Sequence, residues 1–427
     1  MFELGVSVVD AIAHSEEGKA LKTVPRLQIF KQLRTVFKPL MIAWQLALKN
    51  ALGTYKPDLA ILATFPAFFG PYILKNANVP YIVVHTVPAW PTRDFLPPNL
   101  GSFTSPLGLL NLCAWMLGNV VNDSYMLSPL DDEVRIAEGL PPHTSGEKKE
   151  MKESRAKTLT LHIVSPALVP TPADWPPSQQ MAGQCILQKD RRIWDEETQT
   201  LLAPSTLVNY RPDPLLEAFI AKATSSETPV LYFGFGSMLG TLVDSKQSLK
   251  VIDAVLAGTA AHERPVAMIV HVTGLSSQDT DAIQTPDSLK ERVHFHRGFV
   301  PHSWLFPRCD MIIHHGGIGT TQAAILYGLR RDEKAGDNQY YGPVQWIVAA
   351  TTLSDQPYWG DCISRRKLGP ASILSDKLTS AHVLAAVGQA LFGDIRQRQL
   401  WKQNVGDLGL RMWKGKDGSD FAAEEID

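Results

Sequence analysis

The hydrophobic positions in the first half of the chain change their period along the sequence. Residues 27–52 space large apolar side chains three and four apart, the period of an amphipathic helix, which Pro39 is expected to break or kink. Short apolar runs without polar alternation follow at 59–64, 80–86 and 158–170. Strands of this kind, separated by helical segments, are typical of a parallel sheet covered on both faces.

The second half of the chain repeats this alternation with clearer signals. Residues 246–262 are predicted to form a helix, and a second helix over 378–393 is expected to begin at Thr379 or Ser380 as its cap. Apolar runs around these helices predict strands within 229–238, 266–274, 292–300, 309–313 and 345–352.

These patterns predict two α/β domains in a chain of 427 residues, which is long enough for two cores. A Pro-spaced stretch, 206–228, is expected to link a first domain, 1–205, to a second, 229–393. Residues 394–427 are predicted to form a helical tail that packs towards the first domain. The strand–helix order of the second domain predicts a doubly wound sheet, whose ligands bind at the carboxyl ends of its strands.

Composition narrows the class of protein. The chain is 44% hydrophobic and 20% charged with a formal net charge of -2, so no basic excess for binding nucleic acid is present. The four cysteines are far apart, which argues against a disulfide framework or a structural zinc site. The first residues do not resemble a secretory signal, and the apolar stretch 106–121 is shorter than the roughly 20 residues of a spanning helix. We therefore expect a cytoplasmic protein.

Two Gly-rich turns carry the strongest chemical signal. Gly236 and Ser237 follow the strand LYF, and the segment HHGGIGTT, residues 314–321, lies between the strand MII and a predicted helix. Glycines let a backbone approach a bulky ligand, and a helix N-terminus offers free N–H groups to a diphosphate. Each turn alone is also compatible with a plain strand-to-helix turn. Neither matches the dinucleotide fingerprint or the phosphate loop, so hydride transfer and ATP hydrolysis are poorly supported.

A third turn contains Asp355 and Gln356, just after the strand WIVAATT. A carboxylate beside an amide suits hydrogen bonding to neighbouring sugar hydroxyls. A helix-capping Asp followed by Gln and Pro would give the same letters, and this simpler interpretation stays open.

Taken together, these segments resemble the family-1 glycosyltransferases, and most closely the sterol 3-beta-glucosyltransferase branch. The resemblance covers roughly residues 55–425 and is most specific over 297–328, where order, spacing and residue type agree. It implies the GT-B fold, in which two Rossmann-like doubly wound domains face a central cleft. It further implies inverting transfer of a hexose from UDP-glucose, used as co-substrate, with no metal and no other cofactor.

The resemblance also implies roles for individual residues. Phe299 would lie against the uracil, and Val300 would contact it through its backbone. The diphosphate would be held by the two Gly-rich turns, and the sugar hydroxyls by the third turn. The implied donor residues are Gly236, Ser237, Phe299, Val300, His315, Gly317, Gly319, Thr320, Asp355 and Gln356.

Two departures from the family pattern are visible. The Gly-rich loop that normally carries the catalytic base is not matched, so the first domain is expected to be incomplete at its N-terminus. His14 and His85 are the candidate bases, although an ordinary surface helix is the simpler explanation for His14 and a structural role stays open for His85. The second departure is an insertion, 329–342, which is expected to be a surface loop close to the donor site.

The acceptor is expected to be apolar, a sterol by resemblance, because aromatic segments of the first domain would line its site, among them Phe68, Trp90, Phe95 and Trp115. A protein that binds a UDP-sugar or a lipid without turnover is the main alternative. A nucleotide-sugar epimerase would need paired carboxylates, of which the third turn offers one. A peripheral membrane contact through residues 109–117 is a further hypothesis, and the oligomeric state is left open.

Overall fold

The structure is a computed structural model of the 427-residue chain. It describes residues 29–426 except for Phe65, 99–106, 122–126, 187–190, 193, 196–199, 202–203, 205–206, 208–209, 237–244, 274, 332–338 and 351–353. Two compact units are present. Unit 1 comprises the described residues of 29–97, 107–163 and 171–181, and unit 2 comprises Pro98 and the described residues of 164–170 and 182–426.

Unit 1 contains a four-stranded parallel sheet in the order β1-β2-β3-β4, which confirms the predicted parallel sheet. Its strands are β1 (Ala60–Ala63), β2 (Tyr81–His85), β3 (Thr160–His162) and β4 (Gln179–Met181). The sequence pattern did not predict β4, because QQM carries no hydrophobic run of its own. The helices are α3 (Ile29–Tyr55), η2 (Pro66–Phe68), α4 (Gly70–Asn76), α5 (Gly108–Val121), α6 (Leu127–Ala137) and α7 (Ser145–Arg155).

The long helix α3 continues through Pro39 and does not end there. Its apolar face, with Leu40, Met41 and Trp44, packs against Phe69 and against residues of α6 in one buried cluster. Burial of several large side chains outweighs the roughly 3 kcal/mol that an interior proline costs a helix. The helix therefore has no break at this residue.

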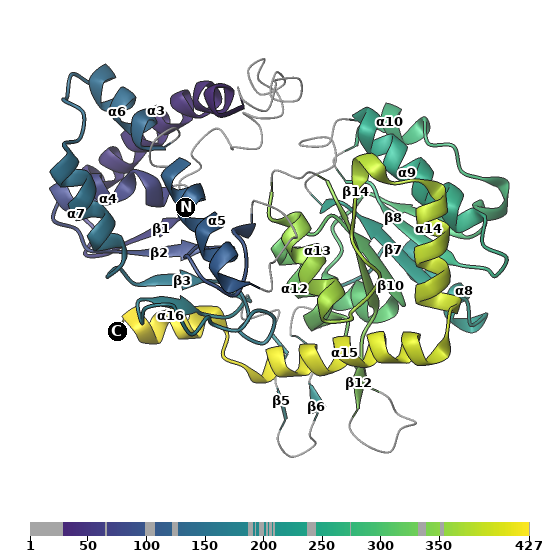
Figure 1. The fold of residues 1–427 in the computed structure, drawn as a ribbon. Coiled ribbons are helices and arrows are strands. Elements are labelled where there is room, and N and C mark those ends of the chain that lie inside the picture. Colours follow the sequence, from purple (N-terminus) through teal and green to yellow (C-terminus); the bar gives the residue numbers. More distant parts are fainter. Residues whose placement is uncertain are drawn as a thin grey trace. The chain divides into compact units, whose positions relative to one another are not determined.

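Unit 2 contains a six-stranded parallel sheet in the order β14-β13-β10-β7-β8-β9 (Figure 1). Along the chain, β7, β8 and β9 lead from the centre of the sheet to one edge, and β10, β13 and β14 lead from the centre to the other edge. This is the doubly wound arrangement that the sequence predicted. The strands are β7 (Val230–Gly234), β8 (Ala267–His271), β9 (Val293–His296), β10 (Met311–His314), β13 (Val344–Ala349) and β14 (Ile373–Leu374).

Helices cover both faces of this sheet (Figure 1). Alternate residues of β7 point to opposite sides, since Leu231 and Phe233 belong to one buried cluster and Val230 and Tyr232 to another. The first cluster includes residues of α9 and α14, and the second includes residues of α8, α11 and α12. The helices are α8 (Pro214–Ser225), α9 (Ser245–Ala260), α10 (Ser277–Asp281), η8 (Asp287–Leu289), α11 (His302–Leu305), η9 (Phe306–Arg308), α12 (Ile318–Tyr327), α13 (Gln356–Arg365), η10 (Ser375–Lys377), α14 (Ser380–Val387), η11 (Gly388–Phe392), α15 (Ile395–Lys414) and α16 (Gly418–Ile426).

The tail after the last strand belongs to unit 2. Asp394 caps α15 by accepting hydrogen bonds from the N–H groups of Arg396 and Gln397. The start of α16 is tied to residues 182–191, because Asp417 accepts from the Ile186 N–H at 3.0 Å and from the Arg191 guanidinium at 2.7 Å. These bonds attach residues 182–191 to unit 2. Unit 2 therefore already includes the chain from residue 182, whereas the sequence predicted that the first domain extends to residue 205.

Two short antiparallel hairpins complete unit 2. One pairs β5 (Trp194–Asp195) with β6 (Thr200–Leu201), and the other pairs β11 (Arg330–Arg331) with β12 (Tyr340–Tyr341). The second hairpin is the described part of the insertion. Helix α15 packs on β12, where the Gly342 N–H donates to the Lys402 carbonyl at 3.0 Å.

Candidate functional site

The centre of the unit 2 sheet is a topological switch point. Strands β7 and β10 are neighbours, and from them the chain winds to β8 on one side and to β13 on the other. Gly234 and His314, the last residues of the two strands, pair in the ladder. Ligands of doubly wound sheets bind where the winding reverses, outside the carboxyl ends of the strands. Both Gly-rich turns begin at this point.

The turn after β10 requires glycine at residue 316. Gly316 has a φ of +88°, and a Cβ there would come within 2.7 Å of Ile347 Cγ2 and 3.1 Å of the Gln356 carbonyl oxygen. The Gly316 N–H donates to Nδ1 of the fully buried His314 at 3.2 Å. This bond requires an unprotonated Nδ1, so His314 holds the turn as a neutral ring.

Gly316 and Gly319 give a matched test of this geometry. Gly316→Ala is expected to lower the free energy of unfolding by about 2 kcal/mol, because it adds a left-handed residue and a steric overlap. Gly319→Ala is expected to leave stability unchanged or slightly higher, because a Cβ there meets no described atom within 4 Å. Urea denaturation measures the difference, and equal stabilities of the two variants would contradict the left-handed turn.

Helix α12 begins directly beyond the turn and presents its N-terminus at the switch point. Its N-cap is Gly317, which has no side chain to cap the N–H groups of the first turn. Those groups lack helical partners and carry the positive end of the helix dipole. This end of the 10-residue helix is suited to a phosphate group. Gly319 and Thr320, two of the residues predicted to hold a diphosphate, lie in the first turn.

His315 lies between the helix and the turn after β7. Its ring is buried, and burial lowers its pKa to about 4, so the imidazole is neutral near pH 7. Nδ1 has no hydrogen-bond partner among the described residues. A buried polar atom without a partner is costly, and a bound ligand can satisfy it. A neutral ring of this kind can donate one N–H to a phosphate oxygen.

The turn after β7 lies close to this histidine. Gly236 has a φ of +53°, and a Cβ there would lie 3.3 Å from His315 Cε1. Pairing of β7 with β10 thus brings the two Gly-rich turns, far apart in the sequence, close together. Ser237, the other residue predicted in this turn, lies outside the described residues.

The third turn joins the other two at the carboxyl end of β13. Gln356 Oε1 accepts from the Ala350 N–H at 2.6 Å, and the Gln356 backbone lies against Gly316. Asp355 precedes α13, and its Oδ2 accepts from Trp359 Nε1 at 2.6 Å. Burial raises the pKa of Asp355. Trp359 and Ala350 thus orient the two side chains, and the Gln356 amide N–H₂ and the Asp355 carboxylate can still bind a ligand.

Phe299 and Val300 follow β9, at the same carboxyl edge of the sheet. Val300 is buried in the core, whereas the Phe299 ring is 86% exposed. The preceding Gly298 carbonyl lies 3.1 Å from Nε2 of His271, at the end of β8. A large aromatic ring that is almost fully exposed at a ligand-binding edge can stack on a planar base.

The two candidate bases have different outcomes. His14 lies outside the described residues. His85 ends β2 in unit 1, where its Nδ1 lies 3.2 Å from Thr64 Oγ1 and its ring stacks on that of His162 at 5.5 Å. Burial, and to a lesser degree the neighbouring His162, lowers the pKa of His85 to about 3. Such a ring is neutral near pH 7 but weakly basic.

The predicted acceptor residues also lie in unit 1. Trp115 and Phe95 are buried against each other, and Phe95 also packs against Trp175. Trp115 Nε1 donates to the Phe95 carbonyl at 2.8 Å. Phe68 and Trp90 are half-buried. Phe95 and Trp115 therefore form part of the core of unit 1, and Phe68 and Trp90 keep surface for a ligand.

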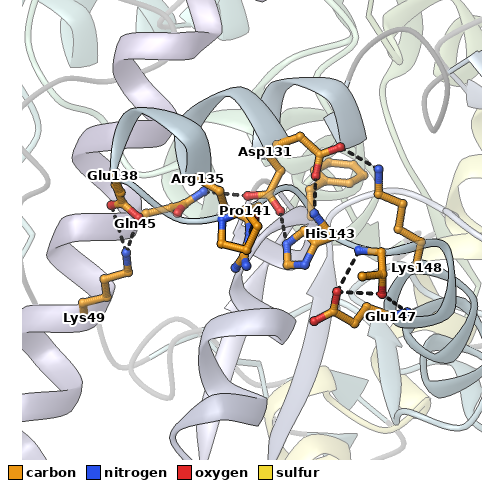
Figure 2. Close-up of polar contacts among 12 residues, drawn as sticks. Gln45, Lys49, Asp131, Arg135, Glu138, Pro141, His143, Glu147 and Lys148 are labelled. Carbon is orange, nitrogen blue, oxygen red and sulfur yellow. Dashed lines mark hydrogen bonds and ion pairs between the residues drawn. The ribbon is translucent and has the colours of Figure 1, made fainter.

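A separate cavity of about 320 Å³ lies among α3, α4 and α6 in unit 1. At its side, the buried Asp131 carboxylate accepts from Gln45 Nε2 at 2.7 Å and lies 2.9 Å from His143 Nε2 (Figure 2). None of the four predicted acceptor residues is among the described residues that line this cavity. The polar cluster joins α3 to α6 and to the segment before α7, so its visible role is structural.

The described residues of the insertion, 329–331 and 339–342, are not close to the turns after β7, β10 and β13, here called the donor turns. Helix α12 leads away from the carboxyl end of β10. Strand β13 is parallel to β10, so it starts at the opposite end of the sheet, where the strands have their amino ends. The hairpin β11–β12 interrupts this α12-to-β13 connection. For these described residues the expected position near the donor site is therefore wrong, because a helix that crosses between parallel strands returns the chain to their amino ends.

The described part of the chain has neither a metal-binding cluster nor a membrane-spanning helix. No group of three or more His, Cys, Asp or Glu side chains among those residues is arranged to hold a metal ion. No helix among them is both long and apolar enough to cross a membrane.

Two residues that shape the site were not predicted from the sequence. Gly316 provides the left-handed turn, and its signal was the first residue of a Gly-Gly pair shortly after a strand. Trp359 orients Asp355 through its indole N–H, and it stands one helical turn after that residue. An aspartate and a tryptophan four residues apart are visible in the sequence, but this spacing also occurs in helices that bind no ligand.

Known proteins with similar sequences belong to the family that the motifs indicated. A sterol 3-beta-glucosyltransferase of Arabidopsis thaliana is 25% identical over 378 residues, 86% of this chain and 51% of that protein. A second one from the same plant is 26% identical over 76% of this chain and 42% of its own length. A sterol 3-beta-glucosyltransferase of Candida albicans is 27% identical over 76% of this chain and 19% of its own length. The chain thus spans about half, or less, of these relatives, and no family model matches it.

Solved structures show the fold. The calicheamicin glycosyltransferase CalG4 superposes with a TM-score of 0.57 at 14% identity, over 94% of this chain and 81% of that one. The spinosyn rhamnosyltransferase SpnG, complexed with thymidine diphosphate, gives a TM-score of 0.53 at 12% identity, over 99% of this chain and 85% of that one. The structural similarities confirm the expected GT-B fold, and the sequence relatives confirm the resemblance to sterol glucosyltransferases.

Proposed function

We propose that this chain, which has the GT-B fold and is similar in sequence to sterol 3-beta-glucosyltransferases, transfers a hexose from UDP-glucose to a hydroxyl of an apolar acceptor. The observation that supports this most strongly is the set of groups at the switch point of unit 2. The N-terminus of α12, the buried His315, whose Nδ1 has no partner in the described part of the chain, and the Asp355–Gln356 pair lie there. A diphosphate next to a sugar would use all of these groups.

The donor would be held along the carboxyl edge of the sheet. The diphosphate would accept hydrogen bonds from the N–H groups of Gly319 and Thr320 at the start of α12. The exposed ring of Phe299 would stack on the uracil, and the Val300 backbone would contact it. The Asp355 carboxylate and the Gln356 amide would bind sugar hydroxyls, since Trp359 and Ala350 orient the two side chains.

The reaction would be a single displacement with inversion. A base removes the proton from the acceptor hydroxyl, the oxygen attacks the anomeric carbon, and the bond to the UDP oxygen breaks. The negative charge that develops on UDP lies at the α12 N-terminus and beside His315, whose N–H can donate to it. This stabilisation would replace that of a divalent cation.

A binding protein without turnover is the second candidate, and one observation favours it. His85 is the described candidate base, and burial lowers its pKa to about 3, far below the range of an effective general base near pH 7. UDP-sugar binding would then persist without transfer.

The acceptor is proposed to be a sterol or another lipid-like alcohol that unit 1 binds. The half-buried aromatic rings of Phe68 and Trp90 lie on this unit. Helix α5 adds an apolar surface without a charged side chain, and it exposes Leu109, Leu117 and Val120 by 56 to 66%. An exposed apolar helix face of this kind can contact a membrane that holds the acceptor.

A membrane contact through α5 has a direct test. The double variant Leu109→Ser/Leu117→Ser is expected to reduce the partition coefficient onto phosphatidylcholine–sterol vesicles by about 100-fold, because each leucine loses about 1.5 kcal/mol of burial. Trp115, which lies within the same hypothetical contact segment 109–117, is buried and is left unchanged. Undiminished co-sedimentation of the variant with the vesicles would end the proposed contact.

Turnover of UDP-glucose with a sterol tests the proposed function. The expected product is a β-linked sterol glucoside with release of one UDP for each glucoside, and the rate should be unaffected by a chelator. Mass spectrometry and the anomeric coupling constant identify the product. UDP-glucose binding without any product would favour the binding protein, and the absence of both would overturn the proposal.

A further inference from the structure

The amino edge of the unit 2 sheet has a second cavity, of about 260 Å³. It lies where β7 and β10 begin, at the end of the sheet opposite to the donor turns, because all strands are parallel. Among the residues that the structure describes, four cationic side chains and two carboxylates line it, which is an excess of two formal positive charges. The charged lining residues are Glu227, Arg308, Asp310, Arg330, Arg398 and Lys402.

Asp310 is the carboxylate that two of the cations share. Its Oδ2 accepts from the Val230 N–H at 3.0 Å, which fixes it at the start of β7. Its Oδ1 lies 3.4 Å from both Arg330 Nη2 and Lys402 Nζ. These contacts are long for charge-assisted hydrogen bonds, which are usually about 2.8 Å. One carboxylate at that distance leaves much of the positive charge of the two side chains uncompensated.

The other two cations are held by backbone carbonyls. Arg308 Nη1 donates to the Trp304 carbonyl at 2.6 Å, and its guanidinium lies 4.5 Å above the Trp304 ring. Arg398 donates through Nε and Nη1 to the Gly393 and Leu391 carbonyls at 3.1 and 3.0 Å. Carbonyls fix a guanidinium without neutralising it. Since a guanidinium has more N–H donors than these bonds use, both arginines keep N–H groups for a further acceptor.

The insertion supplies one of the four cations. Arg330 opens β11, donates to the Cys309 carbonyl and lies 5.5 Å from the Tyr341 ring of β12. Its Nε is buried and has no partner among the described residues. Lys402 comes from α15, which packs on the same hairpin (Figure 1). The segment that interrupts the family resemblance is therefore part of the wall of this cavity.

We propose that this cavity is a second binding site, specific for a phosphate-bearing anion such as a phosphomonoester. Guanidinium groups that are fixed in advance and have unused N–H donors bind phosphate oxygens with little loss of entropy. The excess of positive charge favours an anion, and the volume admits one phosphate with a small substituent. The site lies at the opposite end of the sheet from the donor turns, so it does not depend on the proposed transfer.

Calorimetric titration of the full chain with inorganic phosphate at low salt tests the site. Saturating UDP is present, so that the α12 N-terminus is filled. One phosphate is expected to bind the unchanged protein, and Lys402→Gln is expected to weaken it at least fivefold. The double variant Arg330→Gln/Lys402→Gln should abolish binding. The matched control is Arg396→Gln, which removes an exposed cation from the same helix α15 outside the cavity.

Two results would overturn the proposal. One is equal phosphate binding by the double variant and the unchanged protein, and the other is an absence of phosphate binding to the unchanged protein. If circular dichroism shows that the double variant does not fold, the phosphate affinities of Lys402→Gln and Arg396→Gln are compared, and this comparison alone decides. If UDP does not bind, the same comparison holds, because none of these residues lies at the donor turns. Phosphatidylcholine vesicles with and without phosphatidic acid then distinguish a lipid source of the phosphate from a free one.

Discussion

His315→Ala is expected to weaken UDP binding by about 10- to 100-fold, because it removes a hydrogen bond to a charged phosphate in a buried site. The ring is placed for this role by the two Gly-rich turns, with Gly236 and Gly317 both close to it. Its Nδ1 lacks a partner among the described residues, so the ligand would satisfy a nitrogen that is otherwise unpaired. Isothermal titration calorimetry with UDP measures the change.

A conservative variant separates hydrogen bonding from packing. His315→Gln keeps an N–H donor of similar reach and is expected to retain more of the UDP affinity than His315→Ala. Denaturation curves of both variants show whether the site remains folded. A UDP affinity of His315→Ala within about threefold of the unchanged protein, a difference far below that of a charged hydrogen bond, would show that the diphosphate lies elsewhere.

The free energy of unfolding is expected to fall by about 4 kcal/mol when the pH is lowered from about 7 to about 5, because two buried histidines of unit 2 must remain neutral in the folded state. Burial lowers the pKa of His314 to about 3, with a smaller contribution from His315, and lowers that of His315 to about 4. In the unfolded chain both rings titrate at about 6.5, so the unfolded state binds more protons below that pH. Their contribution is therefore fully present above about pH 6.5 and is lost as the pH falls towards about 4 for His315 and about 3 for His314.

The origin of this acid sensitivity is local. Nδ1 of His314 accepts the Gly316 N–H, and a protonated ring would place a second N–H against the first. His314→Gln removes the titrating group while it keeps an acceptor for this N–H. Urea denaturation at about pH 7.5 and about pH 5 should show a smaller loss in this variant than in the control His382→Gln, at an exposed position of α14. Equal losses of unfolding free energy in the two variants would contradict the assignment of the acid sensitivity to His314 and its turn.

Most of unit 2 could be predicted from the sequence, because its central strands are uniformly buried. All five residues of β7 and all four of β10 are buried, so each strand is a nearly continuous apolar run that ends at a glycine or a His-Gly turn. Once the strands are ordered as a doubly wound sheet, Gly236, His315 and Gln356 have to meet at one edge. The contacts of Gly236 with His315 and of Gly316 with Gln356 are what that order requires.

Prediction from the sequence was less accurate where the same residue pattern occurs in two different structural settings. Phe95 and Trp115 are aromatic residues in or near a Pro-rich region, which is typical of a ligand-lining loop, but they pack on each other in the core. The strand β4 carries Gln179, which is buried beside His162, and such polar burial is invisible to a hydrophobic pattern. The insertion was expected near the donor site because it follows the second Gly-rich turn closely in the sequence. Closeness in sequence, however, does not show at which end of a sheet a connection lies.

Hydrogen–deuterium exchange of the full chain with and without UDP would locate the diphosphate on the backbone. We expect slower exchange on UDP binding at 316–321 and 234–236, the two turns that meet at the switch point, and little change in unit 1. Protection confined to the amino edge, around Arg308 and Arg330, would contradict a donor site at these turns. An absence of protection at 316–321 with saturating UDP would contradict it equally.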